Sequence, residues 1–305
     1  MTVGAAKKTW NVSELLGWSI HYLSEKQFDN PRLNAEWLLC HTLKCKRIDL
    51  YAHYDRPMVK KELEAFKALL LRRINHEPLQ YIIGTTEFMG LTFEVNPDVL
   101  IPRPDTELLV EKTLDLCKHN YDEKVYILDI GTGSGALCVS LAFFLEKYNI
   151  PFSITALDIS EKALALAKHN ADRIVGEGKI KFFLGNILDE DSHSDLFQSF
   201  DIIVSNPPYI SDHEFALLPK EVKDYEPEIA LKADAAGLVF YKHVARAAKL
   251  FFRSNLTKKH VIFEVGYNQS EQVKKILAGS GFEIEVYKDY HQIDRVVCGS
   301  LQVEN

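Results

Sequence analysis

The order of hydrophobic and polar positions divides the chain into a helical first part and a mixed second part. Over the first 75 or so residues, hydrophobic side chains recur at the spacing of helices. This pattern predicts one helix from Ser13, as its cap, to Phe28, a second that begins at Pro31, and a third that carries Val59, Leu63, Phe66 and Leu70. We therefore expect residues 1–78 to form a small helical bundle domain.

Residues 79–104 have a different character. Alternating and β-branched segments surround Gly84 and Gly90, and Asn96-Pro97-Asp98 has the composition of a turn. We expect these residues to form a β-hairpin connector between two domains.

From residue 105 to residue 305, strands alternate with helical segments. The expected strands are residues 125–130, 153–158, 180–184, 201–205, 261–265, 282–287 and 295–299. This alternation predicts an α/β fold, in which helices cover both faces of a mostly parallel sheet. The last two strands are joined by too few residues for a parallel crossover, so we expect this pair to be antiparallel.

Composition narrows the class of protein. The 305 residues, 47% of them hydrophobic, suffice for one large or two ordinary domains, and the net charge of −7 gives no overall attraction to nucleic acid. No window approaches the roughly 20 apolar residues of a membrane span, and no signal peptide is apparent. The five cysteines lack metal-ligand spacing and indicate a reducing compartment. We expect a cytoplasmic protein without a metal.

A glycine-rich turn carries the first chemical signal. The apolar strand that ends at Ile130 runs into Gly131-Thr132-Gly133-Ser134-Gly135, and a helix begins near Ala136. The next strand ends in Asp158, where doubly wound folds place an acidic residue that hydrogen-bonds a ribose. The loop also fits the loose dinucleotide fingerprint, so these residues predict a nucleotide-like cofactor without deciding which one.

The sequence Asn206-Pro207-Pro208-Tyr209 carries the second signal. It follows Ile202-Ile203-Val204, which has the pattern of a buried strand. Each proline restricts its own backbone and that of the preceding residue, so the loop is stiff and its carbonyl groups point outward. Asn206 adds a side-chain acceptor, and Tyr209 adds a flat wall. Such a loop could accept both hydrogens of a planar –NH2 group; its alternative role is a rigid turn.

Together, the two motifs resemble those of S-adenosylmethionine-dependent methyltransferases that act on planar amino or amide nitrogens. The chain most resembles the HemK/PrmC group, which methylates the side-chain amide (N5) of the glutamine in the Gly-Gly-Gln motif of peptide chain release factors. Further matching segments are residues 78–84, 87–90, 100–107, 225–227 and 294–297. The resemblance implies the class I methyltransferase fold, with a seven-stranded mostly parallel sheet, after a helical domain that recognises the substrate.

The resemblance also implies roles for single residues. S-adenosyl-L-methionine would be bound by Gly131, Thr132, Gly133, Ser134, Gly135, Asp158, Asn186, Ile187 and Asn206. The substrate would be held by Asn206, Pro207, Pro208 and Tyr209, of which Asn206, Pro207 and Tyr209 are the expected catalytic residues. Phe88 and Arg103 match positions near the substrate channel, and packing between domains is an equally good interpretation of both. A monomer is expected, with release factors as partners and without direct contact to nucleic acid or membrane.

An amide nitrogen is a poor nucleophile because its lone pair is delocalised into the carbonyl group. We expect the Asn206 side-chain carbonyl and the Pro207 backbone carbonyl to accept the two amide hydrogens, which aims the nitrogen at the methyl group. These bonds strengthen as positive charge builds on the nitrogen. Neither a strong general base nor a catalytic histidine is expected.

Three other functions share parts of this pattern. DNA adenine methyltransferases use Asn-Pro-Pro-Tyr on a flipped base, but the net charge of −7 argues against a DNA substrate. A factor-binding scaffold with an inactive fold is disfavoured because Asp158, Asn206 and the glycines are intact. An NAD oxidoreductase would have no use for the proline-rich loop.

Overall fold

The computed structural model describes residues 9–121, 123–189, 194–233, 236–254 and 258–302. The chain forms two compact units, Met1–Gly84 and Thr85–Asn305. We expected the helical domain to end at residue 78, but the division falls after Gly84. Residues 79–83 form a short helix, and its Leu79 and Ile82 pack in the core of the helical unit.

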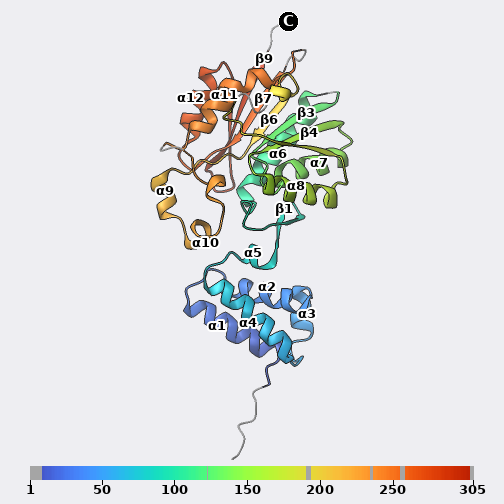
Figure 1. Ribbon diagram of the computed structural model, residues 1–305, viewed down its shortest axis with the longest axis vertical. Helices are drawn as coiled ribbons and strands as arrows, with labels where there is room; N and C mark the ends of the chain where they lie inside the picture. The colour runs from blue at the N-terminus through green and yellow to red at the C-terminus, as the bar shows by residue number, and fades with distance from the viewer. Residues whose placement is uncertain (1–8, 122, 190–193, 234–235, 255–257, 303–305) are drawn as a thin grey trace, which may run out of the picture. The chain divides into compact units, whose positions relative to one another are not determined.

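The first unit is helical. It consists of α1 (Val12–Glu25), α2 (Pro31–Leu43), α3 (Arg47–Ala52), α4 (Lys60–Ile74) and α5 (Leu79–Ile83) (Figure 1). Leu23, Leu38 and Phe66 are among the buried side chains of its core. The predicted bundle is confirmed, although α3 was not predicted from the sequence.

The beginning of α1 differs from the expected cap at Ser13. The Asn11 side-chain oxygen accepts the backbone N–H of Glu14 at 2.8 Å, and the Glu14 carboxylate accepts the backbone N–H of Asn11 at 3.2 Å. This reciprocal capping box begins the helix at Val12, and the helix ends at Glu25 rather than at Phe28.

The second unit begins with an antiparallel hairpin of β1 (Thr85–Phe88) and β2 (Leu91–Glu94). Its turn places Met89 at φ +53° and Gly90 at φ +71°. Two consecutive residues with positive φ match the right-handed twist of the strands they join. The hairpin predicted around Gly90 is therefore present, and by its contacts it belongs to the second unit.

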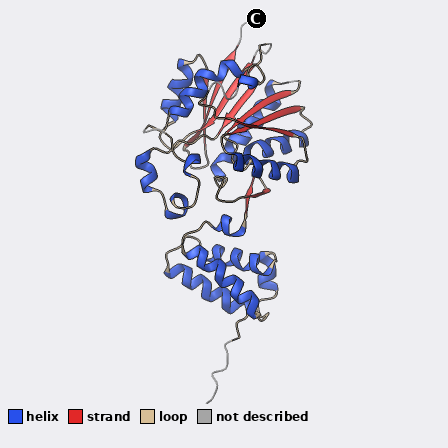
Figure 2. Cartoon of the chain, in the orientation of Figure 1, coloured by secondary structure: helices blue, strands red, loops and turns tan. Residues whose placement is uncertain are grey.

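A seven-stranded sheet forms the middle layer of this unit (Figure 2). Its strands are β3 (Val125–Ile130), β4 (Phe152–Asp158), β5 (Ile180–Leu184), β6 (Ile202–Ser205), β7 (Lys258–Glu264), β8 (Glu283–Lys288) and β9 (Asp294–Gln302). The order is β5-β4-β3-β6-β7-β9-β8; the first five strands of this order are parallel, and β9 is antiparallel to both β7 and β8. The predicted sheet and its antiparallel last pair are confirmed.

Helices cover both faces of the sheet because successive strand residues point to opposite sides. Ile127 packs in the cluster formed with α6 (Glu107–Asn120), α7 (Ala136–Lys147) and α8 (Glu161–Ile174). Leu128 packs in the other cluster, with α11 (Val239–Phe251) and α12 (Ser270–Gly279). The described residues of this unit also form short helical segments, which are η1 (Pro104–Thr106), η3 (Ser194–Leu196), α9 (Asp212–Leu217), α10 (Lys220–Lys223) and η4 (Glu228–Ala230).

The strand order reverses direction at β3. The chain proceeds from β3 to β4 on one side, and β6 pairs with β3 on the other side. Because β3, β4, β5 and β6 are parallel, the loops that follow them meet at one edge of the sheet. Ligands of open α/β sheets bind at such a point of reversal.

Candidate active site

The glycine-rich loop joins β3 to α7. Gly131, Gly133 and Gly135 have φ values of +74°, +55° and +81°, which residues with side chains rarely adopt. A Cβ added at Gly131 or Gly133 would meet no described protein atom within 4 Å, so the backbone is open there. At Gly135 it would lie 3.1 Å from the Cβ of Ala167, so this glycine lets α7 approach α8 closely.

Asp158 ends β4 beside this loop. One carboxylate oxygen accepts the backbone N–H of Gly133 at 2.9 Å, and the other accepts the backbone N–H of Ser160 at 2.9 Å. Burial raises the pKa of Asp158, although the N–H groups of Ser160 and Gly133 oppose the rise. A carboxylate oxygen has more than one acceptor position, so both oxygens can still accept a ligand hydroxyl.

A cavity of about 350 Å³ lies beside Asp158 and the open glycines. Seven predicted residues line it: Gly131, Gly133, Asp158, Asn186, Ile187, Asn206 and Pro208. Much of the remaining wall is apolar and includes Val99, Leu157 and Phe240. An apolar cleft with a few convergent polar groups is typical of a small-molecule site. A carboxylate for ribose hydroxyls and an apolar wall for a base fit the predicted nucleoside-like cofactor.

Thr132, Ser134 and Gly135 were also expected to bind the cofactor, but they are engaged inside the protein. The Thr132 hydroxyl donates to the Asp129 carboxylate at 2.7 Å. The Ser134 backbone carbonyl accepts from the Asn170 side chain at 2.9 Å. These three residues support the loop from the interior of the protein, whereas Gly131 and Gly133 line the cavity.

Asn186 follows β5 and lines the cavity as predicted. Its side-chain oxygen accepts the backbone N–H of Leu188 at 3.0 Å. A carbonyl oxygen has two lone pairs, so this oxygen can accept a second hydrogen from a base. The internal bond holds the side chain in place for that role.

A second cavity, of about 190 Å³, adjoins the proline-rich loop. Its wall consists of Leu100, Arg103, Asn206, Pro207, Tyr209, Ile210, Leu218, Val222, Ala230 and Leu231. Asn206, Leu100 and Ala230 line both cavities. Asn206 therefore lies where a group in one cavity can meet a group in the other. The apolar residues on the two cavity walls could not be predicted from the sequence, because their pattern is the same as that of core residues.

The proline-rich loop is held by Gln269, which precedes α12, and by the end of β7. The Gln269 side-chain nitrogen donates to the Tyr209 backbone carbonyl at 2.9 Å, and the Tyr209 hydroxyl lies 3.4 Å from a carboxylate oxygen of Glu264. A Cβ added at Gly237 would lie 2.3 Å from the Tyr209 carbonyl oxygen, so the chain passes too close for any other residue. Sequence reasoning missed Gln269 and Glu264, because both lie far from the loop in sequence.

Arg103 lies on the wall of the second cavity and pairs with Glu226. Its guanidinium group donates to one Glu226 oxygen at 2.5 Å, and the other oxygen accepts the backbone N–H of Ile101 at 3.3 Å. Burial raises the pKa of Glu226, and Arg103 opposes the rise. The pair holds residues 101–103 against the loop that carries Glu226.

Phe88 was expected near the substrate channel, but its ring is buried in the core of the second unit. The side chain is 1% exposed and meets Phe93 edge to face, with the ring centroids 6.1 Å apart. Its neighbours are core residues of α6 and α7. A ring with this burial has no surface to offer a substrate, so Phe88 serves packing.

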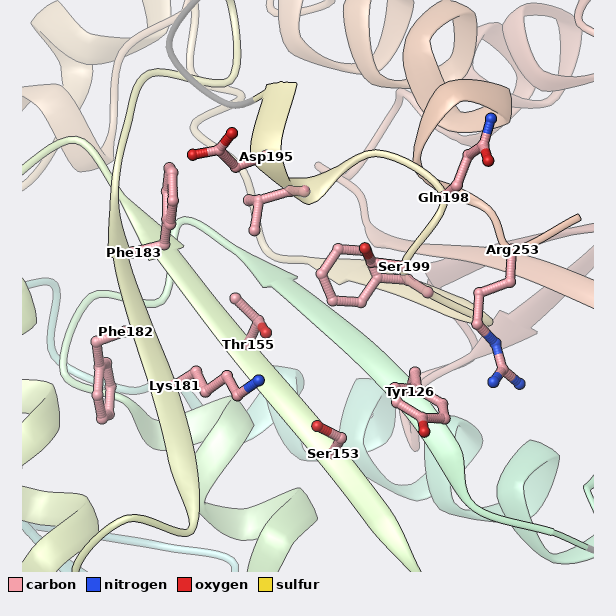
Figure 3. Close-up of a pocket in the computed structure, with 12 residues that line it drawn as sticks. Tyr126, Ser153, Thr155, Lys181, Phe182, Phe183, Asp195, Gln198, Ser199 and Arg253 are labelled. Carbon is pink, nitrogen blue, oxygen red and sulfur yellow. The ribbon is translucent and has the colours of Figure 1, made fainter.

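A further cavity, of about 740 Å³, lies on the sheet over β3, β4 and β5, away from the loops that follow these strands (Figure 3). Tyr126, Ser153 and Lys181 line it, and the Arg253 guanidinium lies 4.2 Å from the Tyr126 ring centroid. Neither motif contributes to its wall. Ligands of parallel sheets gather at the carboxyl ends of the strands, so this cavity is not the candidate active site.

The described residues contain no group of three His, Cys, Asp or Glu side chains that could hold a metal ion. The described helices include none with the length and hydrophobicity that a membrane span requires.

Comparison with known proteins gives the family. Residues 14–84 match the family model described as the PrmC N-terminal domain, and residues 121–277 match a methyltransferase domain. A release factor glutamine methyltransferase of Chlorobaculum tepidum is 39% identical over 95% of this chain and 97% of its own length. The protein of the same description from Bacillus subtilis is 38% identical over 95% of this chain and 98% of its own. The chain belongs to the release factor glutamine methyltransferase family.

Solved structures agree on the fold. One of them is the hMettl16 catalytic domain, which was solved in complex with MAT2A 3′UTR hairpin 1. The match covers 86% of this chain and 90% of the hMettl16 chain, with a TM-score of 0.54 and 17% sequence identity. The predicted methyltransferase activity and S-adenosylmethionine as its cofactor are confirmed by membership of the release factor glutamine methyltransferase family.

Proposed function

We propose that this methyltransferase transfers the methyl group of S-adenosylmethionine to the side-chain amide nitrogen (N5) of the glutamine in the Gly-Gly-Gln motif of peptide chain release factors. The names of its relatives support release factors as the substrate class. The position of Asn206 on the walls of both cavities is the observation that carries the assignment of the site.

Each cavity has one role in this proposal. The 350 Å³ cavity holds the cofactor, with Asp158 on the ribose hydroxyls and Asn186 beside the adenine. The 190 Å³ cavity receives the glutamine side chain, with Tyr209 and Arg103 on its wall. The cofactor supplies an electrophilic methyl group on a sulfonium. Because Leu100, Asn206 and Ala230 line both cavities, the two reactants would be held next to each other, which lowers the entropic part of the barrier.

The residues of the proline-rich loop orient the amide. The Asn206 side-chain carbonyl and the Pro207 backbone carbonyl accept its two hydrogens. The amide nitrogen loses its planar geometry as it reacts, and both hydrogen bonds strengthen while positive charge develops on it. The surplus proton becomes acidic only after transfer, so water can take it.

We further propose that the helical unit recognises the release factor and that the protein acts as a monomer in the cytoplasm. Trp18 and Trp37 expose 45% and 38% of their surface on this unit, and exposed tryptophans often anchor protein partners. The five cysteines are free thiols, as expected in a reducing compartment.

Mass spectrometry of a purified release factor tests the proposal. After incubation with the protein and S-adenosylmethionine, we expect one added methyl group on the glutamine of Gly-Gly-Gln. A release factor with asparagine in place of this glutamine is the matched control and stays unmodified. A parallel reaction with duplex DNA tests the related adenine methylation. Methylated adenine with an unmodified release factor would reverse the assignment.

A further inference from the structure

A chain of hydrogen bonds connects Asn206 to a buried carboxylate. The Asn206 side-chain nitrogen lies 3.1 Å from the Thr106 hydroxyl oxygen, and this hydroxyl lies 2.6 Å from a carboxylate oxygen of Glu264. Thr106 is 6% exposed and Glu264 is 2% exposed, so water does not compete for these bonds. Thr106 precedes α6 and Glu264 ends β7, so the chain of bonds joins three separate elements.

The donors and acceptors in this chain of bonds can be assigned. An ionised carboxylate only accepts, and a threonine hydroxyl has one hydrogen. Thr106 therefore donates to Glu264 and presents only lone pairs to Asn206. The Asn206 amide must then turn its –NH2 group toward Thr106, because the opposite orientation would place two acceptor oxygens against each other. The carbonyl oxygen Oδ1 is left on the side away from Thr106.

We propose that Glu264, acting through Thr106, sets the orientation of the Asn206 amide and so makes Oδ1 available to accept a hydrogen from the substrate. Thr106 and Glu264 are positioning residues, since they act through Asn206. The inference rests on the proposed function only where Oδ1 accepts a hydrogen from the substrate. The orientation itself is a property of the protein without substrate.

The same arrangement makes the orientation dependent on pH. Burial raises the pKa of Glu264 to about 7, and the nearby charge of Asp105 adds to this rise. The hydrogen bond from Thr106, the charge of Arg295 and the Tyr209 hydroxyl lower the pKa and so oppose the rise. Asp105 and Arg295 are themselves paired at 3.0 Å, and the Tyr241 hydroxyl donates to the Glu264 backbone carbonyl at 2.9 Å.

A protonated Glu264 can donate to Thr106, and Thr106 can then donate to Oδ1 of Asn206 in the flipped orientation. The preference for the productive orientation is therefore present when Glu264 is ionised and is lost as the pH falls through about 7. The methyl-transfer rate should rise with pH over this range.

Three variants test the inference by single-turnover methylation of a release factor at saturating cofactor. Thr106→Val keeps the shape but removes the hydroxyl, and we expect a rate about tenfold lower at pH 8, the equilibrium effect of one net hydrogen bond. Thr106→Ser keeps the hydroxyl and should recover most of the rate. Glu264→Gln should remove the rise of the rate between pH 6 and pH 8, because no group in the chain of bonds then titrates. Calorimetric cofactor affinity should stay within a few-fold of wild type in all three.

A wild-type rate in Thr106→Val, or a rise with pH that persists in Glu264→Gln, would overturn the inference. A second measurement needs no substrate: the side-chain –NH2 resonances of asparagine in the free protein, labelled with nitrogen-15 and assigned with Asn206→Ala. Those of Asn206 should shift between pH 6 and pH 8 in wild type and not in Glu264→Gln. If they do not move in wild type, the inference fails. If they move but the wild type leaves the release factor unmodified, the proposed function fails instead.

Discussion

Asp158 accepts the backbone N–H of Gly133 at 2.9 Å, so the carboxylate expected to hold the ribose also holds the glycine-rich loop. The other carboxylate oxygen accepts the N–H of Ser160, at the cap of α8. One side chain thus connects the loops that follow β3 and β4. A substitution at Asp158 is expected to change the shape of the cofactor site as well as its charge.

Asp158→Ala should weaken cofactor binding by roughly 10- to 100-fold, because it removes hydrogen bonds of a charged group worth about 1–3 kcal/mol. Asp158→Asn should lose less cofactor affinity than Asp158→Ala, because its amide keeps one acceptor oxygen for the Gly133 N–H. Calorimetric titration with S-adenosylmethionine measures both. Glu161→Ala, which removes an exposed carboxylate from the same segment, is the control and should bind normally. Equal affinity in Asp158→Ala and wild type would contradict the assignment.

Asn206→Ala should fold normally and bind the cofactor with modestly changed affinity, because Asn206 is one of many residues on the cavity wall. The methyl-transfer rate should fall by roughly 10²- to 10³-fold, the usual effect of removing one preorganised hydrogen-bonding group.

Asn206→Asp keeps an acceptor oxygen but loses the donor to Thr106 and adds a negative charge, so we expect partial activity at most. Single-turnover rates at saturating substrates measure both variants. A rate for Asn206→Ala within a few-fold of wild type would show that the proline-rich loop is only a turn.

Periodicity and motifs predicted the strands and the two loops that face the cavities. The β3 and β5 ranges agree with the predicted ones, because short apolar runs between turn residues are a local signal. Asn206, Asp158 and Gly131 were found for a similar reason, since each directly follows or ends a predicted strand.

Long-range partners could not be predicted in this way. The bond between Thr106 and Glu264 joins residues 158 positions apart, and the bond between Asn206 and Thr106 spans 100 positions. Each residue alone has an ordinary place in a helical or strand pattern. Only the meeting of η1, β6 and β7 in the fold gives them a common role. Phe88 is a different case, because it belongs to a segment that resembles the family but its side chain is buried in the core.

Trp18 lies on α1 with its ring stacked on Tyr22, at 5.1 Å between centroids and 9° between planes. If the helical unit recognises the release factor, Trp18→Ala should raise the KM for the factor about fivefold or more, the effect of losing one interface anchor. The kcat and the cofactor affinity should stay near their wild-type values, because the two cavities lie in the second unit. Tyr290→Ala removes a 96% exposed ring from the second unit and serves as the control. An unchanged KM in Trp18→Ala would remove this residue from the binding surface.

His260 should make stability depend on acid pH. This histidine lies in β7 and is 4% exposed. Its Nδ1 atom is 2.9 Å from the Ser300 hydroxyl, and its Nε2 atom is buried without a hydrogen-bond partner among the described residues. Burial, helped by Lys258, lowers the pKa of His260 from 6.5 to about 4. The unfolded chain therefore takes up a proton below pH 6.5, while the folded protein does not until about pH 4.

This difference contributes stability that is fully present above pH 6.5 and is lost as the pH falls toward 4. At 1.36 kcal/mol per pKa unit, the loss is on the order of 3 kcal/mol. His260→Gln cannot titrate, so its free energy of unfolding should fall less than that of wild type between pH 7 and pH 4.5. Urea unfolding at the two pH values measures the difference, with His53→Gln as an exposed control that should follow wild type. Parallel losses in wild type and His260→Gln would show that other groups cause the acid sensitivity.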